Sequence, residues 1–374
     1  MNRKRTSISI TLFAFCALLF ESCLVDIPYA ASNPLNDPEI VVPNVVNSAV
    51  VDSISSTIIY PNNDVILFRA TSGDVKTIIE SPFHLGFPDL IKYKDTWYAS
   101  LRYSEGHLPK KIGYVIIAKS KDLKVWENEQ IFTQEGYDLR DPKLFIANDS
   151  LYVHFNSTTI NPYGNIRNDY ISKYNRKSGE WGSAKMIKKN TNRKSWFWRI
   201  TYNEGMFYTA AYRVGTPLRL YSSSDGINFN EIYQFDIKGR TTEATLRFYN
   251  DKAFLLLRME DGDALFGEAQ KNNLTDWNFK SINIYRFGGP NFLEYNNIFL
   301  LGGRDYNINK TKLYTYNTHL NLLKEIDIFP SVLDTGYPGM VIDSSFLYFL
   351  YFSGAPDNKH RINLAIIDLN KIIN

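Results

Sequence analysis

Apolar and polar residues along this chain alternate in blocks that are typical of β-hairpins. Between Thr241 and Gly262 an extended segment runs to Asn250-Asp251, and a more strongly apolar segment follows. Asparagine and aspartate tolerate the positive φ of tight turns, so this stretch predicts two antiparallel strands joined by a hairpin turn. Because the first strand then begins where the second ends, Glu243 and Arg258 should lie at one edge of the sheet.

The same layout occurs six times between Phe87 and Leu369. Each copy has an extended segment, a polar turn and a strongly apolar strand, and the copies begin at Asp89, Lys143, Arg199, Thr245, Asn291 and Gly339. A third strand follows each hairpin, and in most copies a loop and a fourth, outer strand complete the unit. This period, about 46–56 residues, predicts an all-β fold, a six-bladed β-propeller with four-stranded antiparallel blades. Two packed β-sandwiches are the alternative, which the near-constant period disfavours.

The sixth repeat ends at its third strand, Ile362 to Leu369. We expect the segment around Val75 to Glu80 to supply the missing outer strand, because this pairing closes the ring and removes an exposed sheet edge. The propeller domain is therefore expected to span residues 57–374. No stretch has the apolar period of an amphipathic helix.

The N-terminus has the features of a targeting segment. Asn2-Arg3-Lys4-Arg5 is basic, and Ile8 to Phe20 is apolar but too short to span a membrane comfortably. Ser22-Cys23 follows, and a small residue before a cysteine at this place resembles a bacterial lipobox, although Glu21 departs from its usual pattern. An ordinary secretory signal and an uncleaved anchor are the alternatives.

We therefore expect residues 1–22 to be a lipoprotein signal peptide, with the lipid on Cys23 and residues 23–56 as a tether. The protein would then be a monomer anchored by lipid in a bacterial cell envelope, facing the periplasm or the cell surface. If Cys16 is removed and Cys23 is lipidated, no cysteine is left for a disulfide.

Composition narrows the classes of partner. A net charge of +3 is too small to indicate nucleic acid. The 25 Tyr and 24 Phe favour an extracytoplasmic all-β protein. The spacings of zinc, calcium and phosphate-binding motifs do not occur, so neither a metal site nor a cofactor is predicted.

The chemistry of a propeller is expected where inner strands begin and second strands end, around the axis. Four of the six second strands end in arginine within one residue of the same place: Arg102, Arg213, Arg258 and Arg304. Guanidinium groups bind carboxylates and sulfates through paired hydrogen bonds, so this gathering predicts an anionic ligand. Buried salt bridges between blades are the alternative role.

Aromatic and acidic residues stand at the starts of the inner strands. Arg199 is a further candidate for binding the substrate. Trp198 beside it could stack on a sugar ring together with Trp196 and Tyr137, or pack between blades. Tyr337, held before Pro338 and Gly339, can act as a nucleophile if a carboxylate lowers its proton affinity, and Glu243 is the candidate partner. A core position is the alternative for Tyr337. The candidate general acids are Asp89 and Asp141.

Two loops share a further pattern. Ser120-Lys121-Asp122 precedes Trp126, and Ser223-Ser224-Asp225 precedes Phe229 at the same spacing. A polar side chain can close such a turn while the aromatic residue packs between sheets, a pattern that resembles the Asp-box of sialidase-like propellers. Together with the repeats, the arginines, the mid-chain glutamate and the last-blade tyrosine, it identifies residues 87–369 as a divergent bacterial lipoprotein branch of the sialidase-like superfamily.

This resemblance implies roles for particular residues. It implies Arg258 and Arg304 as ligands of a substrate carboxylate and Tyr337 with Glu243 as the nucleophile pair. It further implies Asp89 or Asp141 as the acid/base. The family's first-blade motif has an arginine between an aromatic residue and Ile-Pro, whereas the segment at Phe87-Pro88 has none, and Arg102 is the candidate replacement.

Three functions stay open at this stage. The first is a sialidase-like glycoside hydrolase that releases a terminal acidic sugar from a glycan with retention. The second is a polysaccharide lyase acting on uronates, with a tyrosine or one of the histidines His84 and His107 as base. The third is a non-catalytic glycan-binding lipoprotein. In each case the partner is a carbohydrate.

Overall fold

The computed structural model describes residues 57–59, 65–67, 75–160, 166–328 and 331–373. The predictions for residues 1–56, which are the signal peptide, the lipid on Cys23 and the tether, lie outside the described residues. Within the described ranges, no helix has both the length and the apolar character that crossing a membrane requires.

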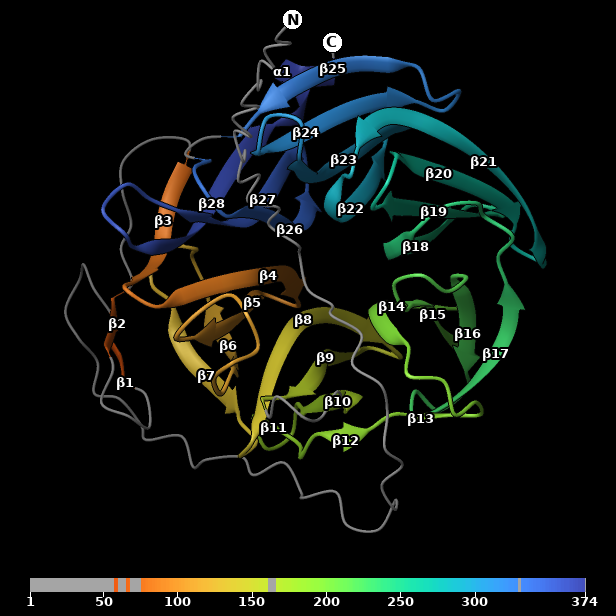
Figure 1. Ribbon diagram of the computed structural model, residues 1–374. Coiled ribbons are helices and arrows are strands. Elements are labelled where there is room, and N and C mark those ends of the chain that lie inside the picture. Colours follow the sequence, from red (N-terminus) through yellow and green to blue (C-terminus); the bar gives the residue numbers. More distant parts are fainter. Residues whose placement is uncertain (1–56, 60–64, 68–74, 161–165, 329–330, 374) are drawn as a thin grey trace, which may run out of the picture. The chain divides into compact units, whose positions relative to one another are not determined.

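In the described part of the chain, six β-sheets surround a common axis, with the first strand of each predicted hairpin innermost (Figure 1). Blade 1 contains β4 (His84–Tyr93), β5 (Thr96–Ser104), β6 (Tyr114–Ser120) and β7 (Glu127–Phe132). Blade 2 contains β8 (Tyr137–Ala147), β9 (Ser150–Thr159), β10 (Arg167–Asn175), β11 (Glu180–Trp181) and β12 (Lys185–Met186). Blade 3 contains β14 (Trp196–Asn203), β15 (Met206–Tyr212), β16 (Arg219–Ser223), β17 (Asn228–Gln234) and, parallel to it, β13 (Lys188–Lys189).

The remaining blades follow the same order outward. Blade 4 contains β18 (Thr241–Tyr249), β19 (Lys252–Met259), β20 (Asp263–Gln270) and β21 (Asn273–Tyr285). Blade 5 contains β22 (Gly288–Tyr295), β23 (Ile298–Asp305), β24 (Lys310–Asn317) and β25 (Leu322–Asp327). Blade 6 contains β26 (Thr335–Asp343), β27 (Phe346–Gly354) and β28 (His360–Asp368). The predicted six-bladed β-propeller with antiparallel blades is therefore confirmed.

Blade 6 is completed by the N-terminal side of the domain, as predicted. β3 (Val75–Ser81) pairs antiparallel with β28, placing Glu80 opposite Arg361 and Ile79 opposite Ile362. β2 (Val65–Leu67) and β1 (Thr57–Ile59) extend this sheet outward. A short helix, α1 (Leu369–Ile373), follows β28 and was not predicted; it buries Leu369 in the hydrophobic core between blades 5 and 6.

The turn residues and the Asp-box-like loops have the geometry that the sequence predicts. The residues at the predicted inner turns adopt positive φ, namely Lys94, Asn148, Asp149, Glu204, Asn250, Asn296, Asn297 and Ser344. In the Asp-box-like loop of blade 1, the amides of Lys124 and Val125 donate to Asp122 Oδ1 at 2.8 and 3.0 Å, and Trp126 is fully buried. The corresponding loop of blade 3 repeats this geometry around Asp225.

Every inner strand carries a β-bulge at the same height. The register against the second strand shifts between residues 86 and 89, 140 and 143, 197 and 200, 241 and 244, 288 and 291, and 336 and 339. In four blades a residue with positive φ directly precedes a proline at this point: Phe87, Asp141, Gly289 and Tyr337. A bulge re-aims side chains, and a proline fits where the ladder needs no N–H donor. The bulges therefore set the positions of the candidate site residues.

Candidate active site

Tyr337, Glu243 and Arg258 form a buried hydrogen-bonded triangle, although they come from two different blades. Tyr337 Oη donates to Glu243 Oε1 at 2.8 Å. Arg258 Nη1 lies 3.1 Å from both Glu243 Oε2 and Tyr337 Oη. The backbone amide of Gly289 donates to Glu243 Oε2 at 2.6 Å. One carboxylate oxygen is thus held by two donors, while the other faces the phenol.

The sequence argument requires a carboxylate that lowers the proton affinity of Tyr337, whereas in the structure Glu243 has the opposite effect. Burial, followed by the charge of Glu243, raises the pKa of Tyr337 well above its ordinary value, because a carboxylate disfavours a second negative charge beside it. Burial, the largest single effect, would lower the pKa of Arg258, but Glu243, Tyr306, Tyr337 and Glu260 together outweigh it and raise the pKa well above its ordinary value. Tyr337 is therefore a neutral phenol at rest. It can become a nucleophile only by passing its proton to Glu243 Oε1 during attack.

A second cluster, of three arginines around Tyr306, adjoins the triangle. The guanidinium carbons of Arg258, Arg286 and Arg304 lie 4.9, 4.8 and 4.5 Å from the centre of the Tyr306 ring. Glu260 pairs with Arg258 and Arg286, each at 2.8 Å. Sequence reasoning missed Arg286 and Tyr306. The available signal was Tyr306 itself, an aromatic residue directly after the end of β23.

Two predicted site residues form an ion pair between blades 1 and 3. Asp89 binds Arg199 through both oxygens, at 2.8 and 3.1 Å, and also accepts the backbone amide of Leu144 at 2.8 Å. Both side chains are buried. With its oxygens engaged in this way, Asp89 is better suited to tying blades together than to donating a proton.

Arg102 is also held by an acidic partner. It is fully buried and bonds both oxygens of Asp138, at 2.8 and 3.1 Å. Arg140 Nη1 lies 3.3 Å from the same carboxylate and its Nε 3.7 Å from Asp141. By contrast Arg213 is an exposed residue just beyond the end of β15.

Trp198 packs against Tyr337, and Lys143 packs against Trp198. Trp198 is 1% exposed and meets the Tyr337 ring edge-on at 5.7 Å, so it supports the tyrosine instead of offering a stacking face to a sugar. Lys143 Nζ lies 5.1 Å from the centre of the Trp198 ring and donates to the carbonyl of Phe87 at 3.3 Å. Burial lowers the pKa of Lys143 to about 8. Sequence reasoning did not identify Lys143 as part of the site.

The sequence and the fold were compared with those of known proteins. No family model and no curated protein matches the sequence. Among solved structures, Trypanosoma rangeli sialidase in complex with the inhibitor DANA aligns with a TM-score of 0.63 and 11% identity, over 86% of this chain and 59% of that chain. The NanB sialidase from Streptococcus pneumoniae aligns with a TM-score of 0.62 and 10% identity, over 77% and 68%.

The chain has the six-bladed propeller fold of the sialidases. A third sialidase structure, from Trypanosoma rangeli with 2,3-difluorosialic acid as a covalent intermediate, aligns with a TM-score of 0.60 and 10% identity, over 85% of this chain and 57% of that chain. The chain thus spans less than two thirds of the Trypanosoma sialidase chains. At these identities the likeness is one of fold.

Blade 1 departs from the sialidase pattern at the arginine two residues before its proline. Here that position is Gly86, and a Cβ on it would lie 2.5 Å from the His84 ring. Phe87 follows, buried at 2% exposure, with its ring centre 5.0 Å from the Arg140 guanidinium carbon and 6.0 Å from that of Arg102. A side chain at position 86 would therefore meet the His84 ring.

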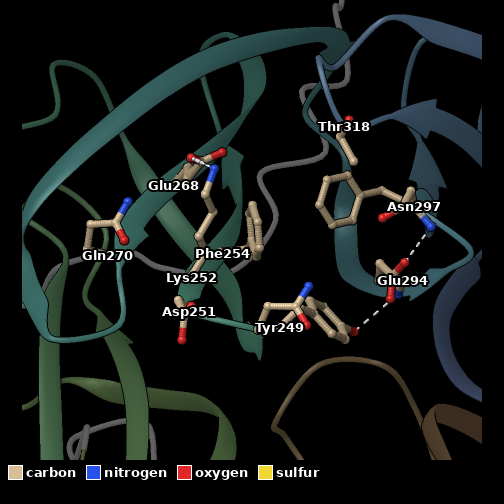
Figure 2. A pocket seen from close by; sticks show the side chains of 11 residues that line it. Tyr249, Asp251, Lys252, Phe254, Glu268, Gln270, Glu294, Asn297 and Thr318 are labelled. Carbon is tan, nitrogen blue, oxygen red and sulfur yellow. Dashed lines mark hydrogen bonds and ion pairs between the residues drawn. The ribbon is translucent and has the colours of Figure 1, made fainter.

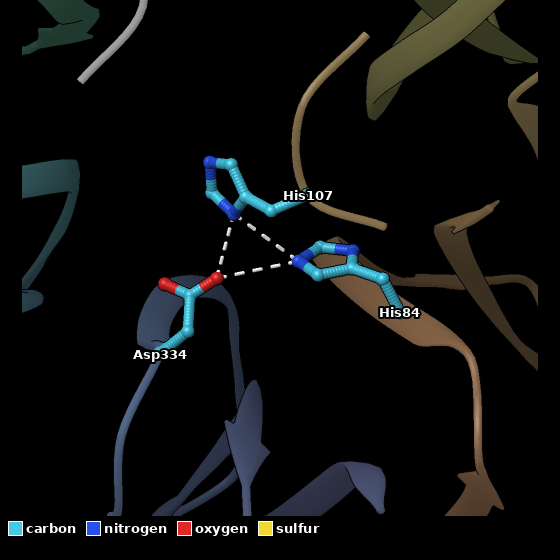
Figure 3. A group of neighbouring side chains, drawn as sticks. All are labelled: His84, His107 and Asp334. Carbon is cyan, nitrogen blue, oxygen red and sulfur yellow. Dashed lines mark hydrogen bonds and ion pairs between the residues drawn. The ribbon is translucent and has the colours of Figure 1, made fainter. Parts of the chain in front are cut away.

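His84, His107 and Asp334 form a compact group beside this departure (Figure 3). One potential ligand atom from each lies within 4.8 Å of the others, which is a spacing that a metal ion could bridge. Arg102 Nη1, which can only donate, lies 3.1 Å from His84 Nδ1, so Nδ1 accepts and Nε2 carries the ring proton. That proton points at Asp334 Oδ2, 3.2 Å away, and occupies the lone pair that a metal would need. The group is therefore better described as a hydrogen-bonded cluster.

A separate hollow of about 430 Å³ lies between blades 4 and 5 (Figure 2). Its lining includes Tyr249, Lys252 and Glu294. Tyr249 ends β18, whereas Glu243 is near the start of that strand, so the hollow is at the opposite end of the blade from the triangle. Lys252 pairs with Glu268 there at 2.5 Å. We do not assign catalysis to this hollow.

Proposed function

We propose that this protein is a sialidase-like glycoside hydrolase that releases a terminal acidic sugar from a glycan with retention of configuration. The observation that carries the proposal is the triangle of Tyr337, Glu243 and Arg258. A phenol within 2.8 Å of a carboxylate, on a propeller with the sialidase fold, is the arrangement that a tyrosine nucleophile requires.

In the first chemical step, Tyr337 Oη bonds to the anomeric carbon while its proton passes to Glu243 Oε1. The bond between the anomeric carbon and the leaving-group oxygen breaks, and that oxygen takes a proton from a general acid. In the second step, water bonds to the anomeric carbon and gives a proton to the deprotonated general acid, while Tyr337 leaves and recovers its proton from Glu243. Arg258 Nη1 contacts both partners, so its positive charge balances the negative charge wherever the proton lies.

Arg258 and Arg304 support the choice of an acidic sugar. The Arg304 side chain is 14% exposed, and its Nη1 lies 2.8 Å from Asp334 Oδ1. A substrate carboxylate would share these guanidinium groups with the acidic residues already there. Gly86 stands where the sialidase motif has a further arginine. We therefore expect the site to prefer carboxylated over neutral sugars less strongly than a site with a complete arginine triad would.

A panel of acidic glycans tests the proposal. Sialosides, uronate-containing oligosaccharides and sulfated glycans are incubated with the protein, and products are analysed by mass spectrometry and NMR. We expect a free acidic monosaccharide that first appears in the anomeric form of the substrate. An unsaturated, ultraviolet-absorbing product would indicate a polysaccharide lyase, and binding without any product would indicate a glycan-binding protein. Either outcome overturns the proposal.

We also propose that the protein acts in a bacterial cell envelope, held by a lipid on Cys23. The basic and apolar segments before Cys23 support this placement. In cells fed a labelled fatty acid, the wild type should carry the label and Cys23→Ala should not. Label retained in the variant would contradict the anchor.

A further inference from the structure

His107 differs from its neighbours in the cluster of Figure 3. It lies in the loop after β5, and its side chain is 39% exposed, compared with 2% for His84. Its Nδ1 is 2.6 Å from Asp334 Oδ2. The other ring nitrogen points away from Asp334 (Figure 3). One side of the imidazole is thus fixed and the other is directed outward.

The proton positions in the cluster follow from its hydrogen bonds. Burial would raise the pKa of Asp334, but the bonds from His107 and His84 outweigh this and hold the pKa well below its ordinary value. Arg304 Nη1 donates to the second oxygen of the carboxylate at 2.8 Å. Asp334 is therefore an anion that accepts the Nδ1 proton of His107. The Nε2 atom of His107 is left to gain and lose a proton.

We propose that His107, oriented by Asp334, is the general acid/base of the reaction at Tyr337. This inference rests on the proposed function and supplies the proton donor that it lacks. The Phe87 ring centre lies 5.5 Å from that of His107 and 5.1 Å from that of Tyr337, so the two side chains flank one residue. Of the aspartates suggested by the sequence, Asp89 is held by Arg199 at 2.8 Å, and Asp141 lies 3.7 Å from the adjacent Arg140.

The proton balance is complete with His107 in this role. In the first step, Nε2–H of His107 donates its proton to the leaving-group oxygen as the glycosidic bond breaks, while Glu243 receives the phenol proton. In the second step, neutral Nε2 takes a proton from the attacking water as Tyr337 departs and recovers its own proton from Glu243. One water is consumed, and both groups return to their starting states.

Two other histidines, two arginines and Asp334 surround His107. His84 is buried, which lowers its pKa to about 3, and burial also lowers the pKa of His360. Both therefore stay neutral near neutral pH. Arg102 faces the cluster through the carbonyl of Gly106 and His84 Nδ1, and Arg304 faces it through Asp334. The Asp334 anion is thus placed to stabilise an imidazolium at His107.

The test compares two glycosides of the sugar released in the panel, beginning with sialic acid. One has an aryl leaving group that needs little protonation, and the other an alkyl leaving group that needs full protonation. We expect His107→Ala to lose about 10²–10⁴-fold in kcat/KM on the alkyl glycoside and far less on the aryl glycoside. The fall of kcat/KM at alkaline pH should disappear in the variant. His319→Ala, on an exposed turn, is the matched control and should behave as the wild type.

Four results would overturn the inference. Equal losses on both glycosides would indicate a structural role for His107, and an unchanged pH profile would exclude it as the acid. A loss of wild-type activity with EDTA that Zn²⁺ restores would show that the cluster holds a metal instead. If the wild type cleaves no glycoside at all, the proposed function fails and the inference fails with it.

Discussion

At the scale of single residues, the site depends on the guanidinium group of Arg258, which donates hydrogen bonds to two partners. Arg258 Nη1 contacts both the carboxylate of Glu243 and the hydroxyl of Tyr337 at 3.1 Å. The proton that passes from Tyr337 to Glu243 therefore stays beside the positive charge of Arg258 throughout. Because the pKa of Arg258 is raised, the arginine stays charged throughout. Preorganised charge of this kind costs no rearrangement at the moment of reaction.

Glu243→Gln tests the base at this scale. The amide keeps the size of the side chain and can accept the phenol hydrogen bond, but it cannot take the proton. We expect kcat to fall by about 10²–10⁴-fold with an unchanged circular dichroism spectrum. Glu268→Gln, in the surface ion pair with Lys252, is the control and should keep full activity. A fully active Glu243→Gln enzyme would remove Glu243 from the mechanism.

Lys143 gives a prediction about stability. Its pKa is about 8 in the folded protein and 10.5 ordinarily, so the unfolded chain binds more protons between these values. The free energy of unfolding should therefore gain up to about 1.4 kcal/mol per pH unit from this group as pH rises from about 8 to 10. Lys143→Met should lack this gain. Urea unfolding of both proteins across that range measures the difference, and parallel curves would contradict it.

At the scale of secondary structure elements, the bulges of the inner strands build the site. Tyr337 and Gly289 are equivalent bulge residues of neighbouring blades, with φ of 54° and 59°. A Cβ on Gly289 would lie 2.5 Å from Tyr337 Cγ and 2.6 Å from its Cα. Blades 5 and 6 can therefore approach closely enough for Tyr337 to reach Glu243 of blade 4 only because the bulge residue of blade 5 has no side chain.

Gly289→Ala should thus displace the Tyr337 side chain while leaving its phenol group unchanged. We expect kcat/KM to fall by about 10²-fold, since a shift of about 1 Å has that effect on aligned groups. The left-handed φ adds a stability loss of about 1 kcal/mol. Gly262→Ala is the control, because a Cβ there meets nothing within 4 Å. Equal activity of the two variants would show that the close approach does not matter.

At the scale of the whole propeller, ring closure joins the ends of the domain. Ile79 of β3 is fully buried opposite Ile362 of β28. Ile79→Ala should lower the free energy of unfolding by about 2–5 kcal/mol. Lys76→Ala, on the same strand but partly exposed, should change it by about 0.5 kcal/mol or less. Chemical denaturation of both variants measures the contrast, and a neutral Ile79→Ala would mean that β3 does not support the ring.

The fold was predictable because its signals are local and repeated. Turn residues such as Asn250 specify each hairpin, and the closing strand follows from the need to remove an edge. The meeting of Glu243, Arg258 and Tyr337 followed from equivalent positions in the repeat. The partners of Asp89 and Arg102 did not, because the repeat brings several acidic and basic residues to the axis without specifying which of them pair. His107 lies in a loop outside the repeat, so no periodic pattern could pair it with Asp334.

The most direct test of the central claim is a search for a covalent bond at Tyr337. The protein is incubated with the 2,3-difluoro derivative of the sugar that it releases, beginning with 2,3-difluorosialic acid, then digested and analysed by mass spectrometry. The account predicts a glycosyl adduct on the peptide containing Tyr337, and no adduct in Tyr337→Phe. An adduct on Glu243, or hydrolysis with inversion and no adduct, would contradict a tyrosine nucleophile.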